Sequence, residues 1–148
     1  MLPAAKGRCD VTADMEAAIR TLRDRQEIAD LLARYCRGID RLDTELIASV
    51  YHPDATDNHG IYKGNVKGFV EFIPTVLRQF SKTMHFLGNS LVEIDGDRAW
   101  AETYCMTHSR IDRPDGTQAD RSGGVRYVDV IERRNGGTVA HSEPDGRV

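Results

Sequence analysis

Residues 83–111 read T-M-H-F-L-G-N-S-L-V-E-I-D-G-D-R-A-W-A-E-T-Y-C-M-T-H-S-R-I, and this stretch decides the fold. It contains two segments with the composition of β-strands, at 83–94 and 98–111. Between them stands Asp95-Gly96-Asp97, a sequence typical of a tight turn. The stretch therefore predicts a long antiparallel hairpin.

The register of this hairpin follows if Gly96 and Asp97 form a two-residue loop. Three pairs of side chains then share one face of the sheet, because side-chain direction alternates along a strand. The pairs are His85 with His108, Leu87 with Met106, and Asn89 with Tyr104. We interpret this face as a pocket wall, although a slip of one residue would break the alignment. The opposite face would pack on another sheet or subunit, through Phe86, Val92, Ala101, Thr103 and Cys105.

A second hairpin is predicted around Pro114-Asp115-Gly116, and it leads into a strand at about residues 118–133. Gly123-Gly124 inside this strand indicates a bulge or a bend.

Upstream of residue 83 the sequence predicts three helices, at about residues 13–39, 44–51 and 65–80. The first has one apolar stripe at helical spacing, formed by Ile28, Leu31, Leu32, Tyr35, Cys36 and Ile39. Asp43 or Thr44 could cap the second helix. Tyr62-Lys63-Gly64 closes a loop or short strand pair, and Pro74 bends the third helix or ends its first part. Helices followed by long antiparallel strands predict an α+β fold with the helices on one face of a curved sheet.

The composition excludes several classes of protein. The 148 residues suit one domain, placed at 13–136 after a flexible arm at 1–12. The net charge is −3 and charges of both signs are interspersed, so we expect no nucleic-acid partner. No apolar run is long enough to cross a bilayer, and residues 1–14 lack the apolar stretch of a signal peptide. We therefore expect a cytoplasmic protein with no membrane partner.

Asp40 departs from the helical pattern. It lies four residues after Cys36, so its carboxylate continues the apolar stripe at a helix end where the dipole favours cations. Two interpretations stay open from position alone: a carboxylate inside a pocket, or a cap of the next helix. We expect no metal, because two histidines converge without a third ligand and the three cysteines match no metal motif.

Tyr35-x-x-x-x-Asp40 followed by Thr83-Met84-His85-Phe86 resembles the SnoaL-like branch of the nuclear transport factor 2-like superfamily. The resemblance spans about residues 20–136 and includes Tyr62-Lys63-Gly64 and 132–136. It is closest to the branch that contains scytalone dehydratase, bile acid 7α-dehydratase and lindane dehydrochlorinase. It implies a cone-shaped, cystatin-like α+β barrel, with the three helices on the concave face of the sheet and an apolar cavity beneath them.

The resemblance also implies roles for single residues. In those lyases the positions that match Asp40 and His85 form a catalytic Asp–His pair. The position that matches His108 is a second pocket histidine in scytalone dehydratase, and Tyr35 matches the pocket tyrosine of the bile acid enzyme. A pocket role for Asp40 is therefore favoured over a helix cap.

We expect a cofactor-free lyase that performs a 1,2-elimination on a small, largely apolar cyclic substrate. His85 would be the general base, oriented by Asp40, and Tyr35 or His108 would assist the leaving group. The expected substrate-binding residues are Tyr51, Leu87, Asn89, Tyr104, Met106 and Arg126.

Two alternatives remain open. One is an isomerase or polyketide cyclase on the same pocket, which product mass distinguishes from a lyase. The other is a non-catalytic ligand-binding or assembly module, such as the small subunit of a ring-hydroxylating oxygenase, which would co-purify with a large partner. In each case we expect a homodimer or homotrimer.

Residues 137–148 depart from the family pattern, in which a Trp-containing strand usually follows. They read G-T-V-A-H-S-E-P-D-G-R-V and offer only Val139 and Ala140 as apolar strand material. With permitted codons, a shifted frame from Gly136 reads G-E-R-W-R-T-P-N-R-T-V-V-Y, which is closer to that strand. We therefore hypothesise a truncated or frameshifted last strand, and codons incompatible with the shifted peptide would eliminate the idea.

Overall fold

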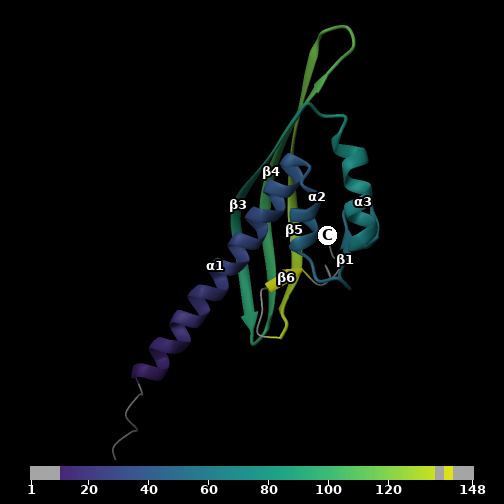
Figure 1. The fold of residues 1–148 in the computed structure, drawn as a ribbon. Helices are drawn as coiled ribbons and strands as arrows, with labels where there is room; N and C mark the ends of the chain where they lie inside the picture. The colour runs from purple at the N-terminus through teal and green to yellow at the C-terminus, as the bar shows by residue number, and fades with distance from the viewer. Residues whose placement is uncertain (1–10, 136–138, 142–148) are drawn as a thin grey trace, which may run out of the picture.

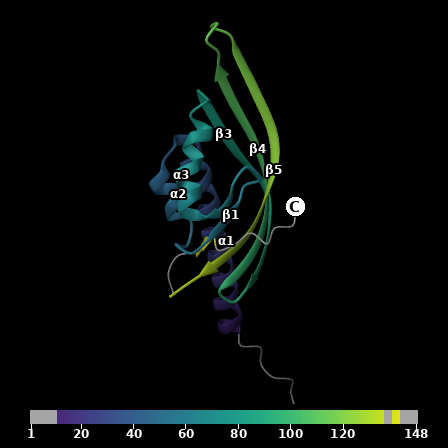
Figure 2. The ribbon, with the colours of Figure 1, turned by 90° about the vertical axis from the view of Figure 1, so that its right-hand side faces the viewer.

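The three helices precede the long strands, as predicted, in a computed structural model that describes residues 11–135 and 139–141. The helices are α1 (Val11–Arg41), α2 (Thr44–Ser49) and α3 (Val66–Leu77). The strands are β1 (Thr56–Asn58), β2 (Lys63–Asn65), β3 (Lys82–Asp95), β4 (Arg98–Asp112), β5 (Gln118–Arg133) and β6 (Val139–His141). All three helices lie on the concave side of the curved sheet, which confirms the α+β class (Figures 1 and 2).

The end of α1 places Asp40 on the helix and in front of the sheet. Leu42 takes a left-handed conformation with φ 54°, and the N–H of Asp43 bonds back to the carbonyl of Gly38. This arrangement ends the helix at Arg41 and satisfies its last carbonyls. A methyl group on Gly38 would lie 2.8 Å from the Ile47 side chain, so the glycine lets α1 and α2 approach closely.

Asp43 caps α2, because its carboxylate accepts a hydrogen bond from the N–H of Leu46. The alternative in which Asp40 caps this helix is therefore wrong. Between α2 and α3, β1 and β2 form the short antiparallel pair expected near Tyr62-Lys63-Gly64. Asn65 caps α3, and Pro74 lies inside this helix.

The main sheet is antiparallel with the strand order β3-β4-β5-β6. Asp95 pairs with Arg98 across the predicted two-residue loop. The second hairpin turns at residues 113–117, where the N–H of Arg113 bonds to the carbonyl of Thr117. This β4–β5 hairpin extends beyond the helices as an arm (Figure 1).

The predicted register of β3 and β4 is correct from Ser90 to the turn and wrong for residues 82–89 of β3, which lie farther from the turn. A β-bulge shifts the pairing between Leu87 and Ser90, so that His85 pairs with Thr107, Leu87 with Cys105, and Met84 with His108. Two residues of β3, Gly88 and Asn89, thus oppose one residue of β4. The extra residue exchanges the two faces of β3 relative to β4.

The exchange reverses the predicted sides of the sheet. His85 and Leu87 share the helix-facing side with buried Val92, Ala101, Thr103 and Cys105, whereas Phe86 is 63% exposed on the outer side. The side chains that were expected beside His85 lie on the outer side with Phe86; they are Tyr104, Met106 and His108.

No bulge occurs at Gly123-Gly124, because β4 and β5 pair without a shift from Arg98–Glu132 to Asp112–Gln118. Methyl groups at the two glycines would make only ordinary contacts, at 3.5 Å from Thr107 Oγ1 and 3.8 Å from Met106 Sδ. Neither the strand pairing nor the space around these two positions explains why both are glycine.

The core lies between the helices and the inner side of the sheet. The predicted stripe of α1 is buried there, together with Ile47, Val50, Phe69, Ile73, Ala99, Ala101 and Ile131. Arg133 at the end of β5 ties the sheet to α1, because its guanidinium donates to Asp24 at 2.7 Å and to Glu27 at 3.0 Å.

Two segments named in the sequence analysis fall largely outside the described residues. Of the expected arm at 1–12, only Val11 and Thr12 are described, and they belong to α1. Of the expected atypical tail, only β6 is described, and it pairs with residues 131–133 of β5.

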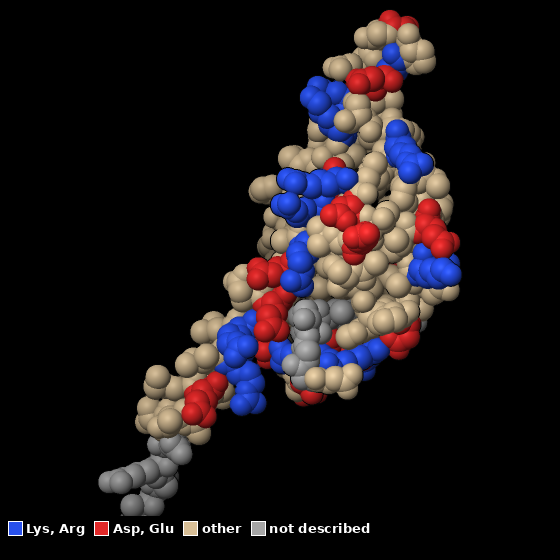
Figure 3. All heavy atoms as spheres, viewed as in Figure 1, with Lys and Arg blue, Asp and Glu red and all other residues tan. Residues whose placement is uncertain are grey.

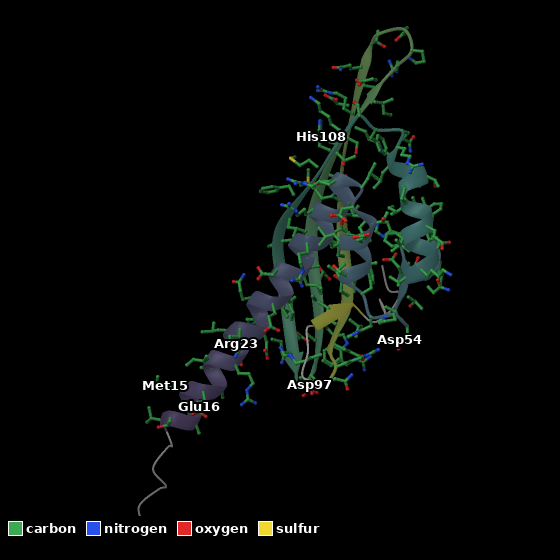
Figure 4. All side chains as sticks on the ribbon, viewed as in Figure 1. Met15, Glu16, Arg23, Asp54, Asp97 and His108 are labelled. Atoms are coloured by element: carbon green, nitrogen blue, oxygen red, sulfur yellow. The ribbon has the colours of Figure 1, made fainter. Side chains whose placement is uncertain are left out.

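Two apolar surfaces of the described residues remain exposed. One is a stripe at helical spacing on the projecting part of α1, formed by Val11, Met15, Ile19 and Leu22 (Figure 4). The other is the outer side of the sheet, with Met84, Phe86, Leu91, Trp100 and Met106. Lys and Arg alternate with Asp and Glu over the face shown in Figure 3. Within the described chain, no helix is both long and apolar enough to cross a membrane.

Candidate functional site

The structure brings Asp40 and His85 together. Asp40 Oδ1 lies 2.6 Å from His85 Nδ1, and Asp40 Oδ2 accepts the backbone N–H of His85 at 3.0 Å. The two side chains are 22% and 14% exposed, so water reaches the pair only in part. This is the contact on which the sequence hypothesis depends, formed between the end of α1 and the start of β3.

The contact selects one tautomer of a neutral His85. A carboxylate can only accept hydrogen bonds, so Nδ1 must carry the proton and Nε2 keeps its lone pair. Both oxygens of Asp40 accept from the same residue, which fixes the plane of the imidazole. An imidazole held in this way can take a proton at Nε2, while the carboxylate stabilises the imidazolium that forms.

Two thiols lie near this pair. Burial, with smaller contributions from the neighbouring Cys105 and the Asp40 carboxylate, raises the pKa of Cys36 to about 12. Burial also raises the pKa of Cys105 above its ordinary value. Both thiols are therefore neutral and serve as apolar lining, as predicted for Cys36.

A separate cavity of about 80 Å³ lies between α1, β1 and β5. It is lined by Leu32, Tyr35, Tyr51, Asp57, Asn58, His59, Arg126, Tyr127, Val128 and Asp129. Asp40 and His85 are not among these residues. Tyr35 belongs to the same helix as Asp40, five residues before it.

The cavity contains a second carboxylate–imidazole pair. Asp57 Oδ1 lies 3.2 Å from His59 Nδ1, and Asp57 Oδ2 accepts the hydroxyl of Tyr51 at 2.7 Å. The other ring nitrogen of His59, Nε2, lies 3.5 Å from the hydroxyl of Tyr35. The ring of Phe69 packs against His59, with the ring centroids 5.0 Å apart.

The tyrosines of this cavity remain protonated. Burial raises the pKa of Tyr35 well above its ordinary value, and the Asp57 carboxylate adds to the effect. The pKa of Tyr51 rises for the same reasons, burial first and then Tyr35 and Asp57. Burial likewise raises the pKa of Tyr127. The phenols are thus hydrogen-bond donors across the physiological range.

Of the predicted site residues, Tyr35, Tyr51 and Arg126 line the cavity, and Leu87 shares the side of His85. The prediction that Asn89, Tyr104, Met106 and His108 lie beside His85 is wrong, because the bulge reverses the first part of β3 relative to β4. His108 Nδ1 lies 3.0 Å from Ser122 Oγ near the projecting hairpin (Figure 4). Met106 is 57% exposed, and Asn89 lies in the bulge itself.

Tyr104 and Arg126 form a pair on the outer side. The Arg126 guanidinium lies 5.9 Å from the Tyr104 ring centroid and 3.7 Å from the Glu102 carboxylate. Arg126 therefore belongs to the cavity wall because of its position in β5, while its guanidinium lies by Glu102 and Tyr104 on the outer side of the sheet.

Sequence reasoning missed four titratable residues of the cavity, Asp57, His59, Tyr127 and Asp129. Asp57-x-His59 has the alternation that puts two side chains on one side of a strand. β1 has only three residues, too few for that alternation to be recognised. In the described part of the chain, no three His, Cys, Asp or Glu side chains are grouped to hold a metal ion.

Comparison with protein families matches residues 20–139 to a SnoaL-like domain. Among curated proteins, the uncharacterized protein Rv2910c of Mycobacterium tuberculosis is 30% identical over 101 residues. The match covers 66% of this chain and 69% of the relative.

Solved structures match at low identity. The hexachlorocyclohexane dehydrochlorinase LinA-type3 of Novosphingobium barchaimii superposes with a TM-score of 0.73 at 21% identity, covering 85% of this chain and 86% of that one. A candidate scytalone dehydratase of Novosphingobium aromaticivorans superposes with a TM-score of 0.72 at 14% identity, covering 86% and 97%. These likenesses establish the shared fold.

Proposed function

The chain belongs to the SnoaL-like domain family, and from this membership we propose that it is a cofactor-free lyase that performs a 1,2-elimination on a small cyclic substrate. Structures of the same fold include a dehydrochlorinase and a candidate scytalone dehydratase. Both names describe an elimination reaction. The observation that carries the proposal is the double contact between Asp40 and His85.

The proposed reaction uses His85 as the base. Nε2 takes a proton from a carbon next to an activating group, and the electron pair of that C–H bond forms the new double bond. The leaving group departs with the electron pair of its own bond. Asp40 acts throughout as the hydrogen-bond acceptor that holds the ring and balances the charge of the imidazolium.

Tyr35 is the donor that we assign to the leaving group. It is a neutral phenol on the same helix as Asp40, whereas His108 lies on the outer side of the sheet.

The cavity of about 80 Å³ is smaller than small-molecule sites, which usually measure about 300–1,000 Å³. A ring-sized substrate therefore occupies the cavity with one end only, or widens it on binding. Cavity walls of Leu32, Tyr35 and Tyr127 favour a largely apolar substrate.

An isomerase on the same pair is the second candidate, because it also begins with proton abstraction at carbon. The mass of the product distinguishes the two, since elimination loses a group and isomerisation conserves mass. We also propose that the protein is a homodimer or homotrimer, formed through the exposed outer side of the sheet. The expected cytoplasmic location stays a prediction.

The test is turnover of a panel of cyclic β-hydroxy ketones and chlorinated cyclohexanes, followed by mass spectrometry. We expect at least one conversion, which His85→Gln reduces by roughly 10²–10⁴-fold, with a smaller loss in Asp40→Asn. His52→Gln is the matched control, because His52 is also half-buried and bonds only to the Glu132 carbonyl in the described contacts. Unchanged turnover in His85→Gln would refute the proposal.

A further inference from the structure

The apolar stripe on the projecting part of α1 is not covered by any of the described residues. Residues 11–23 are all exposed, and Asp24 is the first buried residue of the helix. Met15, Ile19 and Leu22 of the stripe are 59%, 54% and 67% exposed. At about 100° per residue, the stripe lies roughly a third of a turn around the helix from the stripe that is buried in the core. It is therefore a separate face, and Figure 1 shows this part of α1 extending away from the sheet.

The spacing of the stripe is that of a contact between helices. Val11, Met15, Ala18 and Leu22 follow one another at intervals of four, three and four residues, which is the repeat of a coiled coil. Ile19 widens the stripe on one side. Helices in proteins are stabilised mainly by packing such an apolar face against a partner. The pattern therefore indicates a second helix as the partner of this face.

Each edge of the stripe carries one acidic and one basic residue. Glu16 and Arg23 lie along one edge (Figure 4), and Asp14 and Arg25 lie along the other. The midpoint of each pair falls between residues 19 and 20. The two edges therefore have the same charge pattern, acidic toward the start of α1 and basic toward the domain, and the same centre.

This pattern is complementary to itself in the antiparallel direction. In a two-fold antiparallel pair, the same edge of the two helices meets, and each contact occurs twice. With the axis between residues 19 and 20, Glu16 of each copy lies level with Arg23 of the other, and Asp14 lies level with Arg25. A parallel pair would instead bring Glu16 beside Asp14 and Arg23 beside Arg25. These like charges oppose the parallel arrangement.

The apolar residues fit the same arrangement. Near the axis, Ile19 of one copy meets Ile19 of the other, and Met15 lies within about 3 Å of the level of Leu22 of the other copy. Ala18 is small, so it lets the two helices approach closely. Four pairs of opposite charges thus enclose one apolar contact.

Arg23 has an exposed guanidinium for this contact. It meets Glu27 of its own helix at 3.9 Å, and the side chain of Arg23 is 76% exposed. Glu27 is also bound at 3.0 Å by Arg133. The weak bridge within α1 therefore leaves the donors of Arg23 accessible to a partner.

We propose that the projecting part of α1 binds a second copy of this chain as an antiparallel, two-fold helix pair. The overlap of residues 11–28 is about 27 Å long, and two single helices bury less surface than a standard interface. The contact is therefore weaker than the one expected on the outer side of the sheet. It joins two of the assemblies that the sheet forms, and it is independent of the lyase function.

Sedimentation velocity between about 1 and 100 μM measures this association. We expect the mass of the wild type to double over this range, and Met15→Glu with Leu22→Glu to abolish the doubling. Arg23→Glu should weaken it roughly 5- to 30-fold, because two attractive pairs become repulsive. Adding Glu16→Arg to Arg23→Glu exchanges the charges of that edge and should restore it. Arg20→Glu is the matched control, because Arg20 is exposed on the opposite face of the helix.

Disulfide cross-linking measures the direction of the pair, in a Cys9→Ser background because the other two cysteines are buried. Ile19→Cys lies near the axis and should cross-link to its own copy. Met15→Cys should not, because its two copies stand about 13 Å apart along the axis. A mixture of Met15→Cys and Leu22→Cys should give the cross-linked heterodimer.

Four results would overturn the proposal. They are a mass that does not double up to about 100 μM, doubling that persists in Met15→Glu with Leu22→Glu, no rescue by the exchanged charges, and cross-linking of Met15→Cys to its own copy. The contact is also separable from that of the sheet. Phe86→Glu with Met106→Glu should lower the mass at about 1 μM and keep the Ile19→Cys cross-link.

Discussion

Asp40 occupies a position that local electrostatics disfavour. A carboxylate in the last turn of a helix opposes the helix dipole, at a cost of about 0.3–1 kcal/mol. Two hydrogen bonds from His85 offset this cost, and both come from a residue 45 positions away. A sequence that keeps an unfavourable charge for one distant imidazole is typical of a site rather than of a cap.

At the same scale, the state of Cys36 leads to a prediction. With a pKa of about 12, roughly one thiol in ten thousand is ionised at pH 8, and the thiolate is the reactive form. We expect iodoacetamide to label Cys36 in the native protein no faster than the protein unfolds, and rapidly in urea. Peptide mass spectrometry measures both rates, and fast native labelling would contradict the burial of this thiol.

The buried tyrosines predict a loss of stability at high pH. The pKa of Tyr35, Tyr51 and Tyr127 is higher in the folded chain than the value of about 10 in the unfolded chain. The folded state therefore keeps protons that the unfolded state releases. The resulting stability is complete below pH 10 and falls as the pH rises, by about 1.4 kcal/mol per pH unit for each tyrosine.

Urea denaturation between pH 8 and 11 measures this dependence. Tyr127→Phe removes one of the three groups, so its free energy of unfolding should fall less steeply above pH 10 than that of the wild type. Parallel curves for the two proteins would show that Tyr127 ionises as easily in the folded chain as in the unfolded one.

Among the secondary-structure elements, β3 shows where prediction from sequence succeeds and where it stops. The Asp95-Gly96-Asp97 turn has a local signal, and it fixes the pairing from Asp95–Arg98 to Ser90–Thr103. The bulge at Gly88-Asn89 has no sequence signal stronger than that of Gly123-Gly124, where no bulge occurs. Because the extra residue of the bulge was not predicted, the two faces at the start of β3 were exchanged in the prediction. His108 was therefore wrongly placed beside His85.

The predicted pairing of Asp40 with His85 was unaffected by this error, because it did not depend on the register of β4. It rested on the helical spacing of α1 and on the resemblance, and the bulge then turns His85 toward α1. The pair Asp57 and His59 was missed for the opposite reason. Asp57 lies in the three-residue strand β1 and His59 follows directly after it, and Tyr35, which meets His59, is 24 positions away in the chain.

The contact between α1 and β5 supports a prediction at the element scale. Arg133 is 19% exposed and binds Asp24 and Glu27, so Arg133→Met leaves the buried carboxylate of Asp24 without this partner. We expect the free energy of unfolding to fall by about 1–3 kcal/mol. Arg134→Met is the control, because its bridges to Asp54 and Glu132 are more exposed and their loss should lower the free energy of unfolding much less. Equal losses in the two variants would argue against a special role for Arg133.

At the scale of the whole molecule, the exposed apolar outer side of the sheet is typical of an interaction surface, and we expect a second copy as its partner. Phe86 and Met106 are paired across β3 and β4 and are both exposed there. We expect sedimentation velocity to show a dimer or trimer, and Phe86→Glu with Met106→Glu to shift it toward the monomer. Gln118→Glu on the projecting hairpin should leave the mass unchanged. A monomeric wild type would contradict the expected assembly.

The central claim is that Asp40 holds His85 with Nε2 ready to take a proton, and the tautomer of His85 tests it without a known substrate. Long-range ¹H–¹⁵N NMR correlations of the ring distinguish the two neutral forms. We predict a protonated Nδ1 and a bare Nε2 in the wild type, with this preference lost in Asp40→Asn. A wild-type His85 that carries its proton on Nε2 would contradict the claim, because that nitrogen could then accept nothing from a substrate.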